Sequence, residues 1–202
     1  AIYLALMESI KIADGQDDKK NRDAIPTILS DALSVSFNRN VGHDYLEDYE
    51  ERYELYNKKE SRIQFDLEYF NKITKGGLPN KTLNIALAGT GVGKSLFMCH
   101  HASSVLLEGK NVLYITLEMA EEKIAERIDA NLLNVAIQDI TDLPKPMFDK
   151  KVDSIAKKTQ GTLIIKEYPT ASAHSGHFKS LLNELALKKS FTPDIIFIDY
   201  LN

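Results

Sequence analysis

The strongest constraint on the fold of this 202-residue chain is one glycine-rich octapeptide, Ala88-Gly-Thr-Gly-Val-Gly-Lys-Ser95. An apolar run, Thr82–Ala88, precedes it, and a segment with helical periodicity, Lys94–Leu107, follows it. A glycine-rich turn between a strand and a helix can direct successive backbone N–H groups at one anion, and the dipole of the helix adds to the attraction. This order of elements therefore predicts a phosphate-binding loop of the Walker A type, with Ala88 in place of the usual first glycine.

In such a loop the backbone cradles the phosphates of a nucleotide, a lysine reaches the β- and γ-phosphates, and a serine hydroxyl ligates Mg²⁺. Here these side chains belong to Lys94 and Ser95, and we expect Gly89, Gly91 and Gly93 to adopt positive φ angles. The alternative is a glycine-rich turn that contains Gly-Lys-Ser by chance. The predicted nucleotide-binding residues are Ala88, Gly89, Thr90, Gly91, Val92, Gly93, Lys94, Ser95 and Leu96.

Two carboxylates each close an apolar run that is typical of a buried strand. Asp199 ends Ile195–Asp199 in the Walker B pattern, and a carboxylate at the C-terminal edge of a parallel sheet can hold Mg²⁺ through a water molecule. Glu118 ends Val112–Glu118 and can orient and deprotonate the water that attacks the γ-phosphate. We therefore predict Lys94 and Glu118 as catalytic residues, and Ser95 and Asp199 as metal ligands. The alternatives are a turn cap for Asp199 and a favourable charge at the next helix's N-terminus for Glu118.

The pattern after Lys75 alternates between strand-like and helix-like segments, which favours an α/β fold with a parallel sheet covered by helices on both faces. The predicted strands are Thr82–Ala88, Asn111–Leu117, Thr162–Lys166 and Ile195–Asp199. The predicted helices are Lys94–Leu107, Glu121–Leu133, Pro146–Lys158 and His177–Lys189.

Residues 1–74 differ from the rest because they are highly charged and carry helical periodicity. Apolar side chains at helix spacing predict a helix over residues 2–13, followed by a charged connector over residues 14–23. Pro26 suits the first turn of a second helix that ends near Phe37. A tyrosine-rich segment, Val41–Lys59, predicts a further amphipathic helix. We divide the chain into residues 1–20, the end of an N-terminal region; 21–74, a helical linker region; and 75–202, the first part of a phosphate-loop ATPase domain.

Composition excludes some classes of protein. The 25 basic and 29 acidic residues give a net charge of −4, so binding to nucleic acid would need a local basic patch. The single cysteine, Cys99, excludes an internal disulfide and a cysteine-rich zinc site, and we expect it to be a small buried hydrophobe. His100 and His101 are adjacent and therefore face different directions on a helix, which makes a metal site there unconvincing. No apolar run approaches the length of about 20 residues that a membrane-spanning helix needs.

The order of the motifs resembles the family of DnaB-type hexameric replicative helicases and, within it, the helicases of T-even-like bacteriophages. The segments that carry this resemblance are Lys72-Ile-Thr-Lys-Gly-Gly-Leu-Pro79, Leu83-Asn-Ile-Ala-Leu-Ala88, Gly93-Lys-Ser95, Leu117-Glu-Met119, Arg127 and Ile198-Asp-Tyr-Leu201. The resemblance extends over nearly the whole chain.

The resemblance implies a RecA-like fold and an ATP- and Mg²⁺-dependent motor that encircles single-stranded DNA as a ring of six subunits. By matching position, Glu118 is the catalytic base, Asp199 is the Walker B residue, and Arg127 lies near the nucleotide-strand helix. The Ile25–Phe37 segment is similar to a linker helix that docks on a neighbouring subunit, with packing inside the chain as the alternative. The implied partners are a primase and a helicase loader, with no membrane, in the cytoplasm of an infected bacterium.

The family's motor domain continues beyond Walker B with a sensor strand, DNA-contacting loops and an arginine finger. Because both ends of the chain look cut, we expect it to be part of a longer polypeptide. In the family the further strand lies between the phosphate-loop strand and the Walker B strand, so four strands alone would leave a gap in the sheet. We expect weak nucleotide binding and negligible ATP turnover from these 202 residues. The alternative functions are another RecA-like ATPase, such as a recombinase or ring ATPase, and a nucleotide-binding assembly module without turnover.

Overall fold

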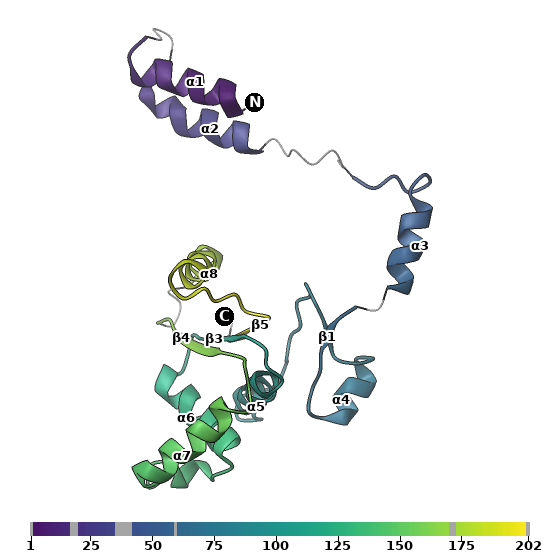
Figure 1. Ribbon diagram of the computed structural model, residues 1–202, viewed down its shortest axis with the longest axis vertical. Helices are drawn as coiled ribbons and strands as arrows, with labels where there is room; N and C mark the ends of the chain where they lie inside the picture. Colours follow the sequence, from purple (N-terminus) through teal and green to yellow (C-terminus); the bar gives the residue numbers. More distant parts are fainter. Residues whose placement is uncertain (1, 17–19, 35–41, 59, 170–172, 201–202) are drawn as a thin grey trace. The chain divides into compact units, whose positions relative to one another are not determined.

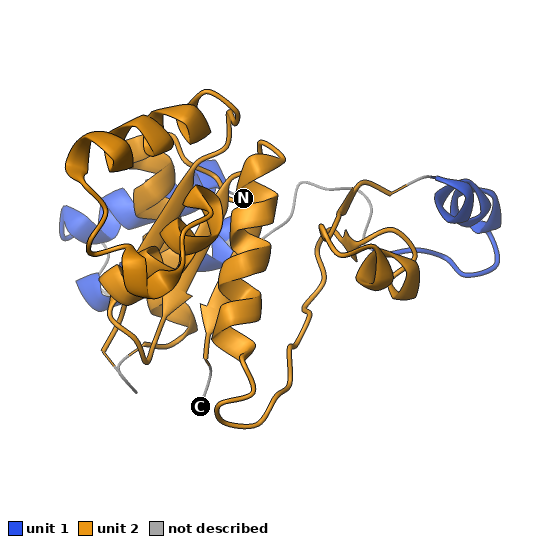
Figure 2. Cartoon of the chain, turned by 90° about the horizontal axis from the view of Figure 1, so that it is seen from below, with its two compact units in different colours: residues 1–59 blue, residues 60–202 orange. Residues whose placement is uncertain are grey.

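The computed structural model describes residues 2–16, 20–34, 42–58, 60–169 and 173–200 (Figure 1). The chain forms two compact units, residues 1–59 and residues 60–202 (Figure 2). The boundary therefore lies between Lys59 and Glu60, whereas the sequence changes character near Lys75. The reason is that residues after Glu60 form a small hairpin that belongs to the second unit.

The first unit contains a helical hairpin made of α1 (Ile2–Ala13) and α2 (Ile25–Ser34), which pack against each other. A short 3₁₀ helix, η1 (Arg22–Ala24), leads into α2. The buried side chains are small or aliphatic, among them Ala5 and Ile12 on α1 and Ala32 on α2. Both predicted helices are confirmed within the described residues, but the predicted end of α2 near Phe37 lies outside them. The buried face of α2 packs on α1, which is the alternative to docking on a neighbouring subunit that the sequence analysis gave for this helix.

The tyrosine-rich segment forms α3 (Tyr49–Asn57), a shorter helix than the predicted one. Asp44 begins the turn before it, because the Asp44 carboxylate accepts hydrogen bonds from the N–H groups of Leu46 and Glu47, both at 2.9 Å. None of the residues of α3 is buried. The predicted helix is therefore present over part of its range, and none of its side chains is covered within the first unit.

The second unit is built on a three-stranded parallel sheet with the order β4-β3-β5. These strands are β3 (Val112–Thr116), β4 (Leu163–Glu167) and β5 (Ile195–Asp199). All five residues of the central strand β3 are buried. The register places Thr116 opposite Asp199, so the C-terminal ends of β3 and β5 meet at one edge. Three of the four predicted strands are thus confirmed to within about a residue at each end.

Helices cover both faces of this sheet, as predicted. On one face α5 (Lys94–Leu107) and α6 (Glu121–Leu133) bury a cluster that includes Cys99, Val105 and Ile124. On the other face α8 (Ser175–Lys189) packs Leu181 and Leu185 against β3. Figure 1 shows α8 on one side of the strands and α5 and α6 on the other. The remaining elements, η2 (Ile137–Asp139) and α7 (Lys145–Ala156), pack against α6.

The prediction of a strand over Thr82–Ala88 is wrong, because this segment carries no strand pairing in the structure. Its apolar side chains lie in solvent, with Leu83 84%, Ile85 79% and Leu87 95% exposed. A strand exists only where a neighbour completes its hydrogen-bond ladder. Among the described residues β5 is the outer strand on that side of the sheet, and nothing pairs with its free edge. The family resemblance places a further strand at that edge, between β5 and the phosphate-loop segment.

The sequence analysis missed a small hairpin in the second unit. Its strands are β1 (Arg62–Ile63) and β2 (Leu78–Pro79), which pair antiparallel, and α4 (Glu68–Ile73) lies between them. Gly77 makes the close approach possible, because a Cβ atom there would lie 2.2 Å from the carbonyl oxygen of Ile63. Two-residue strands leave no periodic pattern in a sequence.

Candidate functional site

The glycine-rich loop turns immediately before α5. Gly91 (φ 77°) and Gly93 (φ 107°) both lie in the left-handed region, and nothing lies within 4 Å of a Cβ atom built on either. Glycine is favoured at these two positions because other residues rarely adopt such φ angles. A Cβ atom would not collide with a neighbour there. The same expectation for Gly89 is wrong, since it does not adopt a positive φ. Helix α5 then begins with the Phe97 N–H donating to the Gly93 carbonyl at 2.9 Å.

The structure brings two predicted site residues together. The Nζ atom of Lys94, at the first position of α5, lies 3.6 Å from Oδ1 of Asp199, at the last position of β5. The same Nζ atom lies 4.0 Å from the ring centroid of Tyr200. The lysine is three-quarters buried and the carboxylate almost wholly so. Its positive charge is thus balanced by a carboxylate and an aromatic face at the mouth of the loop.

The Asp199 carboxylate has one satisfied oxygen and one oxygen without a hydrogen bond. Oδ2 accepts a hydrogen bond from the hydroxyl of Tyr114 at 3.1 Å. Oδ1 is buried and has no hydrogen-bond partner among the described residues. Buried polar atoms normally have hydrogen-bond partners, and within the described ranges this oxygen has only the ion pair with Lys94 at 3.6 Å, so a carboxylate oxygen in this position beside a phosphate-type loop fits a cation. The hydroxyl of Ser95, next to Lys94 on α5, is the other candidate ligand and is half-buried.

Glu118 lies at the same edge of the sheet. The neighbouring Leu117 N–H donates to the Asp199 carbonyl oxygen at 2.8 Å, so the chain leaves β3 alongside the end of β5. Thr116 fixes the turn that follows, because its hydroxyl donates to the Met119 carbonyl at 2.7 Å and accepts from the Met119 N–H at 3.1 Å. This turn carries Glu118 into solvent. The carboxylate is therefore accessible at the C-terminal edge of the sheet, as a group that activates water has to be.

A different carboxylate serves the N-terminus of α6. The Glu121 N–H donates to Oε2 of Glu167, from the end of β4, at 3.1 Å. This contact supplies the negative charge that a helix N-terminus favours. Glu167 therefore already supplies the negative charge at the N-terminus of α6, which was the alternative role for Glu118.

The sequence analysis missed Tyr114 as a contact of the site. Its side chain is fully buried, and burial raises the pKa of its hydroxyl far above the usual value, so the hydroxyl keeps its proton and can donate. The Cys99 thiol donates to the same hydroxyl, with Sγ 3.8 Å from the oxygen. A tyrosine inside an otherwise apolar strand was the available signal, since a buried hydroxyl needs a partner.

Cys99 is buried, as predicted, and its surroundings agree with an inert role. Burial is the main cause that raises the pKa of its thiol, which disfavours the reactive thiolate. The charge of Arg127 on α6 acts in the opposite direction and lowers that pKa, and the Arg127 side chain is half-buried. Among the described residues Arg127 makes no hydrogen bond or ion pair with Lys94, Asp199 or Glu118.

The two histidines of α5 have separate environments, as their adjacency predicts. His100 Nε2 lies 2.6 Å from Oδ2 of Asp66, and its Nδ1 lies 2.7 Å from the Asn131 amide nitrogen. His101 is buried, and its ring stacks on Phe65 with 4.3 Å between centroids. Burial lowers the pKa of His101 to about 4, so the ring is neutral. Within the described ranges no three His, Cys, Asp or Glu side chains form a metal-binding group.

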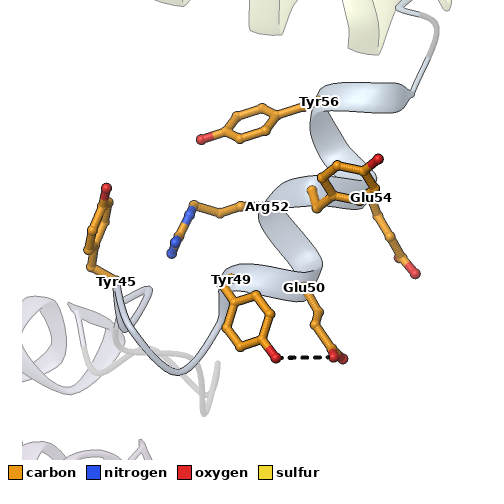
Figure 3. Close-up of a pocket in the computed structure, with 7 residues that line it drawn as sticks. Tyr45, Tyr49, Glu50, Arg52, Glu54 and Tyr56 are labelled. Atoms are coloured by element: carbon orange, nitrogen blue, oxygen red, sulfur yellow. Dashed lines mark hydrogen bonds between the residues drawn. The ribbon is translucent and has the colours of Figure 1, made fainter.

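A shallow pocket lies along α3 in the first unit. Figure 3 shows Tyr49 and Glu50 joined by a hydrogen bond, which measures 3.4 Å from the hydroxyl to Oε1. The guanidinium of Arg52 lies 4.3 Å from the ring centroid of Tyr45. The pocket shares no residue with the glycine-rich loop, and its lining is exposed tyrosine and charged side chains.

Comparisons with known proteins identify the family to which the chain is similar. The family model described as "DnaB-like helicase C terminal domain" matches residues 63–202. The chain is 46% identical to a "DnaB-like replicative helicase" of Enterobacteria phage T4, in an alignment that covers 100% of this chain and 45% of that protein. The chain thus spans less than half the length of this relative.

A solved structure shares the fold. It is described as "The Structure Of A DnaB-Like Replicative Helicase And Its Interactions With Primase". It aligns with a TM-score of 0.57 and 14% identity, over 97% of this chain and 46% of that one. In the parts of the chain that the structure describes, no helix combines the length and the apolar character needed to cross a bilayer.

Proposed function

Because this chain belongs to the family of DnaB-like helicases, we propose that it forms part of a ring-shaped motor that couples ATP hydrolysis to movement on single-stranded DNA. The motor would unwind duplex DNA at the replication fork. The observation that carries this proposal is the approach of Lys94 to Asp199, 3.6 Å apart at the mouth of a glycine-rich loop. A phosphate loop and a Walker B carboxylate in this relation are the core of a nucleotide-hydrolysing site.

The roles of the individual residues follow from their positions. The backbone of residues 88–96 cradles the phosphates, and Lys94 exchanges its contact with Asp199 for the β- and γ-phosphates of ATP. Ser95 and Asp199 would hold Mg²⁺. When bound, Mg²⁺ neutralises charge on the phosphate oxygens. Glu118 orients the attacking water and accepts its proton.

The first unit serves assembly in this proposal. On α1 the apolar side chains of Leu4 and Ile10 are 70% and 53% exposed, and Leu33 on α2 is 69% exposed. Exposed apolar groups on a charged appendage favour docking on another protein surface. We assign that surface to a neighbouring copy in a ring of six. A primase and a helicase loader are the proposed partners, and the host bacterial cytoplasm is the proposed location.

The proposal also accounts for the unpaired Thr82–Ala88 segment. Among the described residues no strand pairs before the loop, and the loop is anchored through α5, so its N–H groups are not held in place for an anion. We therefore expect residues 1–202 by themselves to bind nucleotide weakly and to turn over ATP at a negligible rate. The complete helicase polypeptide that contains this chain is the form in which activity is to be tested.

Replacing Lys94 with alanine tests the proposal. We expect Lys94→Ala in the full-length polypeptide to lower DNA-stimulated ATP hydrolysis by at least about a hundredfold, because one positioned electrostatic group is lost. The matched control is Lys123→Ala on α6, whose lysine pairs with Glu126 and has no contact with the loop. If the protein is instead an assembly module without turnover, the unsubstituted protein will show no DNA-stimulated hydrolysis, and Lys94→Ala will still bind its partners. Wild-type hydrolysis by Lys94→Ala would contradict the proposed function.

A further inference from the structure

The hydroxyl of Tyr114 is the group that contacts Asp199 from inside the sheet, and none of the phosphate-loop roles uses it. It donates to Oδ2 of Asp199 at 3.1 Å, while Oδ1 of the same carboxylate lies 3.6 Å from Lys94 Nζ. We propose that Tyr114 is a positioning residue that fixes one oxygen of Asp199 and so presents the other to the cation. This inference rests on the proposed function, because it concerns the same nucleotide site.

The strand register explains why the residue is a tyrosine. Tyr114 is opposite Phe197 in the parallel ladder, so Asp199 is two residues further along β5 on the same face of the sheet. Such diagonal neighbours are roughly 7–8 Å apart, within reach of an aromatic side chain. A serine or threonine at position 114 is too short to reach the carboxylate. The phenol places a hydroxyl at the end of a rigid, apolar spacer.

Two contacts hold the phenol ring in place. The ring of Tyr114 stacks on that of Phe197, with centroids 5.8 Å apart and an interplanar angle of 18°. The Cys99 thiol of α5 donates to the phenol oxygen, with 3.8 Å between the heavy atoms. Because the phenol oxygen accepts a hydrogen bond from the thiol, its own O–H group is directed toward Asp199. The carboxylate is thereby connected through Tyr114 to the helix that follows the phosphate loop.

Loss of the hydroxyl should act on the cation and not on the phosphates. Asp199 is almost completely buried, so without Tyr114 its Oδ2 loses a hydrogen bond that water does not easily replace. The carboxylate is then free to rotate about its χ2 bond, and Oδ1 no longer faces one fixed point. The loop backbone and Lys94 are not contacted by the Tyr114 hydroxyl, so binding of phosphate without Mg²⁺ should persist.

The test is Tyr114→Phe in the full-length helicase polypeptide, with a fluorescent ATP analogue as the probe. The Mg²⁺ concentration that gives half-maximal binding of the analogue should rise about tenfold, in the range for one lost hydrogen bond to a charged group. The affinity for the analogue in EDTA should change less than about twofold. In the Asp199→Asn background, Tyr114→Phe should add no further shift, because the two residues act as one unit.

The matched control is Tyr168→Phe, since Tyr168 packs on Phe178 beside α8 and makes no contact with Asp199. It should leave the Mg²⁺ dependence unchanged. Wild-type Mg²⁺ dependence in Tyr114→Phe would overturn the inference, and so would an equal loss of affinity in EDTA and in Mg²⁺, which indicates a merely structural role. If the unsubstituted protein binds the analogue with no Mg²⁺ dependence, the proposed function itself fails, and that result is visible before any variant is made.

Discussion

At the scale of single residues, His101 is an unusual member of the core. The ring stacks on Phe65 and on Phe97 and meets Phe197 edge-on, yet both of its nitrogens are buried without a hydrogen-bond partner among the described residues. An unsatisfied buried polar atom costs about 1–3 kcal/mol. A phenyl ring has a similar shape and no polar atom. We expect His101→Phe to increase the free energy of unfolding by about 1–2 kcal/mol at pH 7.

The same residue gives the folded chain a pH dependence of known sign. Burial lowers the pKa of His101 from 6.5 to about 4, so below pH 6.5 the unfolded chain takes up a proton that the folded chain does not. Stability from this site is complete above pH 6.5 and falls as the pH is lowered toward 4. Between pH 7 and pH 5 the wild-type chain should lose about 2 kcal/mol that His101→Phe retains.

Urea unfolding of both proteins at the two pH values measures this difference. The control is His100→Phe, a change at the neighbouring position of α5, which removes the ion pair between His100 and Asp66 and leaves the buried ring of His101 intact. This variant should keep the pH dependence of the wild-type chain. A His101→Phe variant that is less stable at pH 7, with an unchanged pH dependence, would show that the ring nitrogens find partners in solution.

Single residues also mark how far the sequence could predict the site. Lys94, Ser95 and Asp199 follow from local patterns, because a glycine-rich loop and a strand-end carboxylate are visible without a structure. Tyr114 does not, since its contact with Asp199 depends on the register between β3 and β5. The tyrosine in an apolar strand shows that a partner is needed, but the sequence of β3 alone does not specify which residue of β5 lies opposite it.

At the scale of elements, two similar apolar runs adopt different structures. Ile195–Asp199 pairs with β3 and forms a strand, whereas Thr82–Ala88 pairs with nothing among the described residues. Their local composition favours strand in both cases. The difference is the neighbour, which a linear pattern does not encode. Helices need no such neighbour for their hydrogen bonds, and α5, α6 and α8 accordingly agree with their predicted ranges to within about two residues.

Hydrogen exchange tests the unpaired segment directly. In the 202-residue chain, the amides of residues 82–88 should exchange at rates close to those of an unstructured peptide, because no ladder bond protects them. The amides of β3, which lie between two strands, are the internal control and should exchange far more slowly. Equal protection of the two segments would mean that Thr82–Ala88 has joined a sheet.

The missed hairpin makes its own prediction at Gly77. Gly76 and Gly77 have nearly the same φ, 108° and 109°, but only at Gly77 would a Cβ atom collide with the backbone, 2.2 Å from the Ile63 oxygen. Gly77→Ala should therefore separate β1 from β2. It should lower the free energy of unfolding by about 2 kcal/mol more than Gly76→Ala, because Gly76→Ala introduces the unfavourable φ angle without the collision. Thermal unfolding gives the difference in stability, and limited proteolysis near residue 78 reports the opened hairpin. Equal costs for the two variants would show that the close approach is not needed.

At the scale of the whole molecule, the two units have different roles in the proposed function. In the proposed function the second unit holds the hydrolytic site, with Lys94, Glu118 and Asp199 at one edge of its sheet. The first unit holds a helical hairpin and a helix whose tyrosines stay exposed. The net charge of −4 gives the chain no general attraction for DNA. A motor built from this chain therefore depends on ring assembly and on a local DNA-contacting surface.

The measurement that tests the central claim most directly is strand displacement on a forked DNA by the full-length polypeptide, with Glu118→Gln beside the wild-type protein. Glutamine has the size of glutamate but cannot accept the proton of the attacking water. We predict that the wild-type protein unwinds the fork with ATP, while Glu118→Gln binds ATP with unchanged affinity and unwinds at least about a hundredfold more slowly. Glu122→Gln, a few residues further on in the first turn of α6, should unwind normally. Unwinding by Glu118→Gln at the wild-type rate, or none by the wild-type protein, would contradict the account.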